Sequence, residues 1–102
     1  MSLESAQVGS RVWFRGEKKP YRVRAVSQNG RYLVCTKPFN LQRTVLYTVV
    51  DLEKGIRGTE NLVFGLGAET DEQCREMAKR LGVETEVSYR NRVSLDVTRV
   101  DS

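Results

Sequence analysis

Residues 21–52 read YRVRAVSQNGRYLVCTKPFNLQRTVLYTVVDL, and this stretch decides the fold. Its first segment, residues 21–25, alternates apolar side chains with Arg22 and Arg24. That period of two is typical of a strand with one buried face and one wet face. Asn29-Gly30 follows and predicts a type I′ hairpin turn, because both residues tolerate a positive φ.

Two further strands are indicated downstream of the turn. Residues 32–36 are apolar on both faces, and the segment 37–40 interrupts them because Pro38 cannot donate a hydrogen bond to a neighbouring strand. Residues 44–50 are almost wholly β-branched or aromatic. A strand that is apolar on both faces usually lies in the middle of a sheet, so we expect residues 45–50 at its centre.

The flanking segments add shorter strands. Residues 11–15 predict a first strand, and residues 62–64 predict another after a turn at 51–55. Residues 93–100 alternate cleanly and predict a half-buried terminal strand. We expect this last strand to pair near the first one and so to limit the exposed edges of the sheet.

Residues 70–81 carry the clearest helix signal. Thr70 and Gln73 predict a capping box, in which each side chain bonds to the other residue's backbone amide. One apolar stripe at helical spacing should pack on the sheet; it comprises Cys74, Met77, Ala78 and Leu81. Cys74 and Cys35 are expected to be reduced, and a shared core is one arrangement open to them.

Together these segments predict an α+β domain that is mostly β. We expect residues 1–102 to form a single domain, with residues 1–9 as a lead-in that is flexible or derived from a cloning tag. The sheet should be a curled antiparallel sheet or SH3-like partly open barrel of five to six strands, with one α-helix in the C-terminal half. The opening Val-Gly-x-Arg-Val-x-Phe at residues 8–14 favours the SH3-like form, although a fold does not give a function.

Charge is distributed unevenly along the chain. Residues 1–43 hold nine basic and two acidic residues, a net charge of +7, whereas residues 44–102 hold eight basic and eleven acidic residues, a net charge of −3. Such asymmetry predicts a basic face and an acidic remainder. The predicted binding residues are Arg15, Lys18, Lys19, Arg22, Arg24 and Arg31, which converge on one side if the strands pair in sequence order.

A cluster of this kind is typical of phosphate binding, because cations displace the counterions condensed on a nucleic acid. Nearby aromatic residues offer surfaces on which unpaired bases can stack; they are Trp13, Tyr21, Tyr32, Phe39 and Tyr89. The alternative is that the cations only solvate one face of the sheet. For Trp13 and Tyr21, packing in the core is the favoured alternative.

The sequence does not favour catalysis or a metal site. It contains no histidine, which is the commonest general base, and no Cys-x-x-Cys pair. No cofactor motif is complete, since Gly65-Leu66-Gly67 is better read as a turn. No apolar run is long enough to span a bilayer and no signal-peptide pattern opens the chain, so the cytoplasm is the expected compartment.

Several segments resemble a family of short proteins of unknown function encoded by bacteriophages, prophages and actinobacterial genomes. The resemblance is carried by residues 20–25, 34–40, 44–51, 56–65 and 69–74, and it would cover about residues 9–100. It implies a mobile-element origin and partners among phage or host nucleic acids or proteins.

The expected function is therefore a non-enzymatic binding module with a basic face, with DNA or RNA as its leading ligand. The alternative is a protein–protein interaction module that meets a host or phage protein through an aromatic groove or through the basic face.

Overall fold

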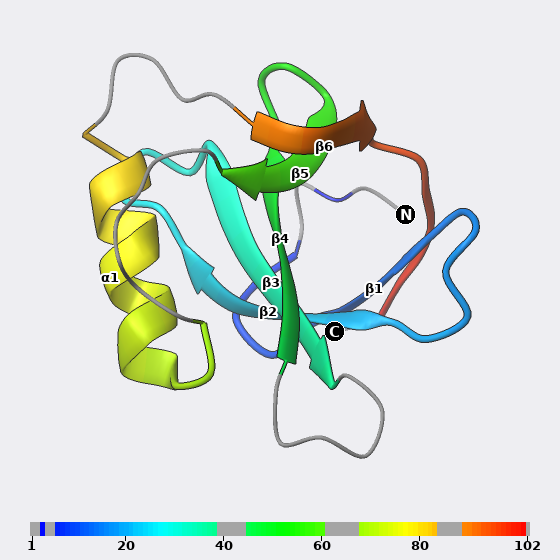
Figure 1. The fold of residues 1–102 in the computed structure, drawn as a ribbon, viewed down its shortest axis with the longest axis horizontal. Coiled ribbons are helices and arrows are strands. Elements are labelled where there is room, and N and C mark those ends of the chain that lie inside the picture. The colour runs from blue at the N-terminus through cyan, green and yellow to red at the C-terminus, as the bar shows by residue number, and fades with distance from the viewer. Residues whose placement is uncertain (1–2, 4–5, 39–44, 61–67, 84–88, 102) are drawn as a thin grey trace.

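The computed structural model describes residues 3, 6–38, 45–60, 68–83 and 89–101. Seven strands and one helix lie within them (Figure 1). In chain order they are β1 (Arg11–Phe14), β2 (Tyr21–Val26), β3 (Tyr32–Pro38), β4 (Val45–Asp51), β5 (Ile56–Glu60), α1 (Asp71–Leu81), β6 (Tyr89–Ser94) and β7 (Val97–Asp101).

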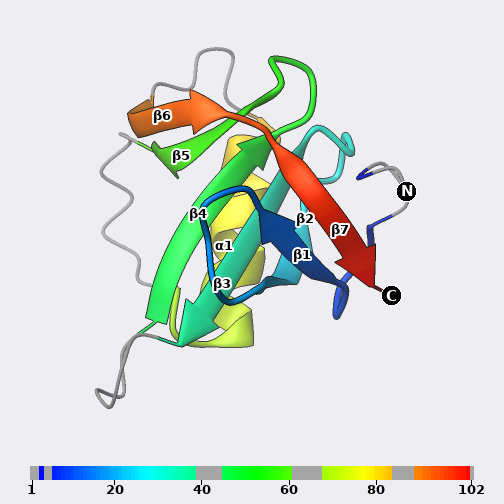
Figure 2. The ribbon, with the colours of Figure 1, turned by 90° about the vertical axis from the view of Figure 1, so that its right-hand side faces the viewer.

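The strands form one antiparallel sheet in the order β6-β5-β4-β3-β2-β1-β7. Its two edge strands, β6 and β7, are consecutive in the chain and form one stretch that crosses from β5 to β1 (Figure 2). At the crossing, the Leu95 amide donates to the Gly55 carbonyl at 2.9 Å, and the Arg15 amide donates to the Asp96 carbonyl at 2.8 Å. The sheet is therefore curled, and the predicted mostly-β architecture with one helix is confirmed.

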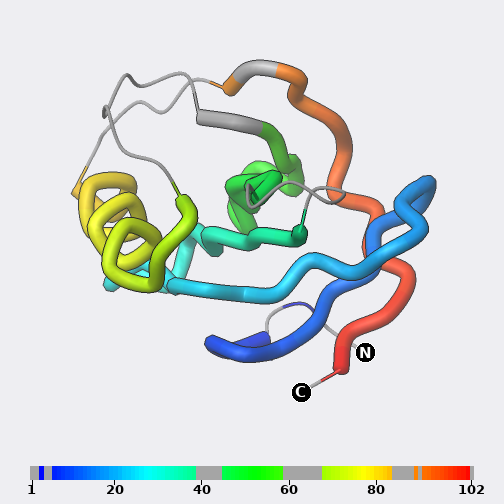
Figure 3. The backbone as a smooth tube through the Cα atoms, turned by 60° about the horizontal axis from the view of Figure 1, so that its bottom comes forward, coloured from blue at the N-terminus to red at the C-terminus, as the bar shows by residue number. Residues whose placement is uncertain are grey.

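Both faces of the sheet are apolar at β3, because the sheet is covered on one side by α1 and encloses a core on the other. Tyr32 and Val34 pack with the helix, whereas Leu33 and Cys35 pack in the interior of the curl. The helix lies outside the curl and contacts β2 and β3 (Figure 3). This arrangement explains why residues 32–36 are all buried.

The helix has the predicted ends and the predicted buried stripe. Thr70 accepts a hydrogen bond from the Gln73 amide at 3.1 Å, and Gln73 accepts one in return from the Thr70 amide. The four stripe residues predicted from the spacing are all buried. No helix in the described part of the chain is long and apolar enough to cross a membrane.

Several sequence expectations need correction. The sheet has seven described strands rather than five or six, and β3, not β4, occupies its centre. The predicted terminal strand 93–100 is divided between β6 and β7, and β6 begins earlier, at Tyr89. The predicted strand 62–64 lies outside the described residues.

The two cysteines do not share a core. Both are buried and free, but Cys35 belongs to the interior of the curl and Cys74 to the face beneath α1. The alternation of side chains along β3 is the reason, because neighbouring residues point to opposite faces. Burial raises the pKa of the Cys35 thiol to about 12.

The hairpin after β2 exists, but its turn is not type I′. A type I′ turn requires a positive φ at both central residues, and of Asn29 and Gly30 only Gly30 has one, at 74°. The Gly30 amide donates to the Ser27 carbonyl, and the Asn29 side chain accepts from the Ser27 hydroxyl and the Arg31 amide. Local side-chain hydrogen bonds thus fix the turn in place of a second positive φ.

A buried carboxylate joins three parts of the sheet. Asp51, at the end of β4, is 0% exposed. It accepts two hydrogen bonds from the Arg31 guanidinium at 3.0 Å each, one from the Tyr89 hydroxyl at 2.8 Å, and two from the amides of Glu53 and Lys54 at 3.1 Å each. The sequence had placed Asp51 in a turn, with no partner.

The environment of Asp51 sets its ionisation. Burial alone would raise the pKa of this carboxyl, but the hydrogen bonds from Arg31, Lys54 and Tyr89 outweigh it and lower the pKa below the ordinary value of 3.8. The carboxylate is therefore ionised at neutral pH and compensated by the Arg31 cation and by three further hydrogen-bond donors.

Asp51→Asn should lower the free energy of unfolding by about 3 kcal/mol, because it leaves the Arg31 cation without its buried partner. Urea unfolding measures this loss. The control is Asp96→Asn, since Asp96 pairs with Arg15 at the surface with half of its side chain exposed, and such a pair is worth no more than about 1 kcal/mol. Equal losses in the two variants would show that Asp51 is not a structural centre.

The Asp51 contribution should also depend on pH. Because the folded-state pKa is lower than the unfolded-state pKa, the contribution is complete above the unfolded value and is lost as the pH falls through the folded value. The difference in unfolding free energy between the wild type and Asp51→Asn should therefore shrink as the pH falls below about 4. A difference that stays constant from neutral pH to about pH 2.5 would contradict this assignment.

Candidate functional site

The outer face of the sheet, beyond the part covered by α1, carries a row of polar residues. Arg22 on β2 is paired in register with Arg11 on β1 and with Thr36 on β3. Residues opposite one another on neighbouring strands point to the same face, so these three side chains lie side by side. Arg11 and Arg22 are exposed.

A bulge in β2 adds Arg24 to this face. The register shifts between Val23 and Ala25, so Val23 packs inside the curl while Ala25 packs beneath α1. Between them, the Arg24 guanidinium donates to the Thr36 hydroxyl at 3.1 Å and, through Nε, to the Asp71 carboxylate at 2.8 Å. The hydrogen bond from Arg24 lowers the pKa of Asp71.

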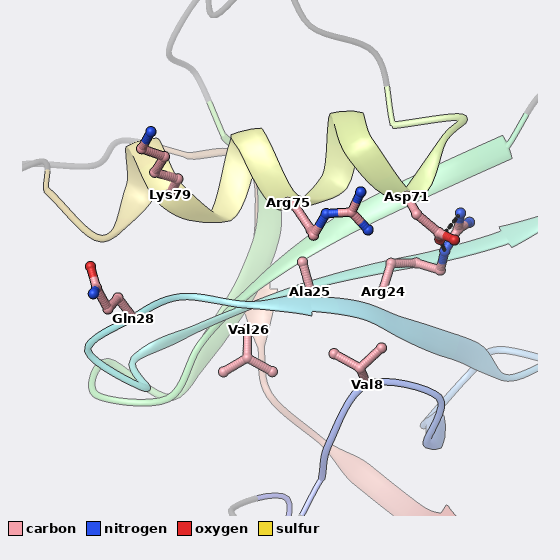
Figure 4. Close-up of a pocket in the computed structure, with 8 residues that line it drawn as sticks. All are labelled: Val8, Arg24, Ala25, Val26, Gln28, Asp71, Arg75 and Lys79. Atoms are coloured by element: carbon pink, nitrogen blue, oxygen red, sulfur yellow. Dashed lines mark hydrogen bonds and ion pairs between the residues drawn. The ribbon is translucent and has the colours of Figure 1, made fainter.

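Three depressions lie on this surface or at its margin. The first, about 410 Å³, lies over the outer face and is lined by Arg11, Lys19, Arg22 and Arg24. The second, about 650 Å³, lies between α1 and β2 (Figure 4). The third, about 390 Å³, lies beside the loop after β1. The first shares Arg24 with the second and both Lys19 and Pro38 with the third, so the three are neighbours.

Eight cationic side chains line these depressions. Lys37 is bound to Glu17, and we name the other seven the basic strip. Its members are Lys18, Lys19, Arg11, Arg22, Arg24, Arg75 and Lys79. Two of them have a carboxylate partner: Arg24 bonds to Asp71, and Arg11 lies 3.5 Å from Asp101. Within the described residues, the other five form no ion pair.

Of the six residues predicted to converge, the structure brings four together and places two elsewhere. Lys18, Lys19, Arg22 and Arg24 belong to the basic strip. Arg15 instead lies beside the β6–β7 crossing, where its Nε donates to Asp96 at 2.6 Å. Arg31 is bound to Asp51 and lies 3.2 Å from Glu53, so it serves the interior of the protein.

Sequence reasoning missed three members of the basic strip. Arg11 was counted in the charge balance but not placed in the site. Arg75 and Lys79 belong to a segment with net negative charge, yet they are exposed and four residues apart, and so lie on one side of α1. Their helical spacing was visible in the sequence, but the packing of α1 beside β2 was not.

The aromatic residues do not form an open stacking surface. Trp13 is only half-buried and is not part of either core, but the guanidinium carbons of Arg11 and Arg99 lie 5.4 and 4.7 Å from its ring centre. The expected core packing is thus wrong for Trp13 and correct for Tyr21. Tyr32 is also buried, the Tyr89 hydroxyl bonds to Asp51, and Phe39 lies outside the described residues.

A second polar cluster is structural. Glu17 accepts from Lys37 at 2.6 Å and from Arg57 at 3.4 Å, and the Arg57 guanidinium lies 4.3 Å from the Phe14 ring centre. The hydrogen bond from Lys37 lowers the pKa of Glu17 despite partial burial. These groups join the loop after β1 to β3 and β5, and Lys37 and Arg57 are therefore not free to bind a ligand.

The described residues contain no group of three histidine, cysteine or acidic side chains that could hold a metal ion. Comparison of the chain with protein-family models, curated proteins and solved structures finds no match. The geometry of the basic strip is therefore the basis for a functional proposal.

Proposed function

We propose that this protein is a non-enzymatic module that binds nucleic acid through the basic strip. The observation that carries the proposal is a set of three neighbouring depressions lined by the seven cations of the basic strip, of which five have no carboxylate partner among the described residues. Such a surface offers repeated positive charge to an extended polyanion rather than one site to a small molecule.

Counterion release supports the proposal. A cation that neutralises a phosphate releases a condensed counterion into bulk solvent, and this release supplies much of the affinity for DNA or RNA. With about five phosphates neutralised, the logarithm of the binding constant should fall with the logarithm of the salt concentration with a slope of about −3.5 for a single strand. The cytoplasm, where such ligands are abundant, is the compartment that suits this function.

The partner could instead be an acidic protein, as the sequence alternative allowed. The aromatic-groove version has less support, because Trp13 lies under two arginines and Tyr21 and Tyr32 are buried. Polyglutamate with the same charge as the oligonucleotide tests whether an acidic protein binds the basic strip instead. It should compete with nucleic acid only weakly, and equal competition would favour a protein partner.

Lys19→Glu combined with Arg22→Glu should lower the affinity for an oligonucleotide of about 20 nucleotides at least tenfold, because both residues lie in the first depression. The salt slope should fall in magnitude by about 1.4, because two phosphate contacts of a single strand are lost. Lys54→Glu with Arg92→Glu is the matched control, since it changes the net charge equally at exposed positions outside the strip. Equal losses in both double variants would show that net charge, not the strip, governs binding.

Asp71→Asn should strengthen binding by about threefold, because it releases Arg24 from its internal partner and leaves one more cation for a phosphate. Fluorescence anisotropy with the same oligonucleotide measures the change. Glu72→Gln is the control, because Glu72 lies in the same helical turn and loses the same charge without touching Arg24. Similar gains in the two variants would argue against a specific restraint by Asp71.

A further inference from the structure

The depression between α1 and β2 separates apolar from cationic side chains. Val8 and Val26 lie on one side of β2, and Arg24 and Arg75 lie on the side that faces the helix (Figure 4). The two valines are 63% and 37% exposed, which is high for branched apolar side chains. The other two depressions of the basic strip lack such a pair of exposed valines.

The depression extends to both faces of β2 because the edge of β2 next to β1 is unpaired over part of its length. β1 pairs with β2 only at Tyr21 and Arg22, and the lead-in continues the contact as far as Val23, whose carbonyl accepts from the Gly9 amide at 2.8 Å. Beyond Val23, no described strand pairs with this edge. A ligand can therefore contact both sides of β2 at once.

The side that faces the helix is strongly cationic. Arg75 and Lys79 project from α1, and no carboxylate of the described residues forms an ion pair with either. Arg24 stands beside them, bound to Asp71. An anionic group placed here meets three cations and one acid.

The ligand that fits must join an anionic group to an apolar one. A nucleotide does so, since its phosphate is charged and its base has apolar faces. We propose that the depression holds one unpaired nucleotide of a single strand, with its phosphate near Arg75 and Lys79 and its base turned over the edge of β2 onto Val8 and Val26. This inference rests on the proposed function and adds a preference for single strands.

A duplex does not fit in the same way. Its bases are stacked and paired, and extracting one costs a few kcal/mol. An acidic peptide also carries charge and apolar groups, but a nucleic-acid strand supplies one phosphate and one base at every step. The repeated cations of the strip, with the apolar valines to one side, suit that pattern better.

The test compares two single strands of equal length and charge: fluorescein-labelled oligothymidylate, and the same backbone carrying abasic spacers in place of the bases. If a base occupies the valine side, the protein should bind oligothymidylate about tenfold more tightly. Equal affinity for the two strands would overturn the inference while leaving polyanion binding intact. Failure to bind either strand would overturn the proposed function itself.

A double variant tests whether the base contacts the two valines. Val8→Asn with Val26→Thr should reduce the preference for oligothymidylate towards equality and leave the affinity for the abasic strand unchanged, because the cations are untouched. Val93→Thr is the control, since Val93 is 46% exposed on β6 and does not line this depression. Thermal unfolding of each variant verifies that the fold is retained. A preference that survives in the double variant would place the base elsewhere and overturn the inference.

Discussion

The fold depends on the satisfied burial of one carboxylate. Asp51 ends β4 and accepts hydrogen bonds from the guanidinium of Arg31, which immediately precedes β3, and from the hydroxyl of Tyr89 at the start of β6. A buried charge with incomplete compensation costs several kcal/mol, so these partners must all be in place. From Tyr89 the chain continues through β6 into β7, which pairs with β1, and β1 supplies Arg11 to the basic strip. The Asp51 contact thus helps to place the strand that carries Arg11, although Arg11 takes no part in it.

The cations of this protein fall into two groups with different surroundings. Arg31, Arg57 and Lys37 have side chains that are 12–24% exposed, and each bonds to a carboxylate that ties separate strands together. Most members of the basic strip are exposed and have no such partner. Arg24 combines both conditions, because it links β2 to the start of α1 through Asp71 and also lines two of the depressions. Whether a cation bonds to a carboxylate therefore separates structural cations from those available to a ligand better than the number of cations does.

Local patterns predicted most of the fold because local forces decide those parts. The capping box at Thr70 and the stripe through Cys74 are properties of one helix, and the alternation of Tyr21 to Ala25 is a property of one strand. The split of residues 93–100 into β6 and β7 was not predictable, because it depends on where the sheet curls back on itself.

The site was predictable only in part for a related reason. Lys18, Lys19 and Arg22 are near one another in the sequence and remain so in the structure. Arg31 is equally near in the sequence, but in the structure it bonds to Asp51, twenty positions away. Asp51 also bonds to Tyr89, and no sequence periodicity connects Tyr89 with Arg31. Arg75 and Lys79 join the strip through tertiary packing of α1 on β2 and β3, which charge counting along the chain cannot show.

The pairing of β1 with β7 bears on the order in which the strands fold. Phe14 pairs with Val97 and Val12 with Val100, so these contacts close the longest loop in the described sheet. The entropy of closing a loop grows with its length, and nascent chains emerge from the ribosome amino-terminal end first. The strands β1 to β4 can therefore assemble early, because each pairs with its neighbour in sequence, whereas the pairing of β1 with β7 must wait until β7 has been synthesised, and we expect this pairing to be a late step in folding.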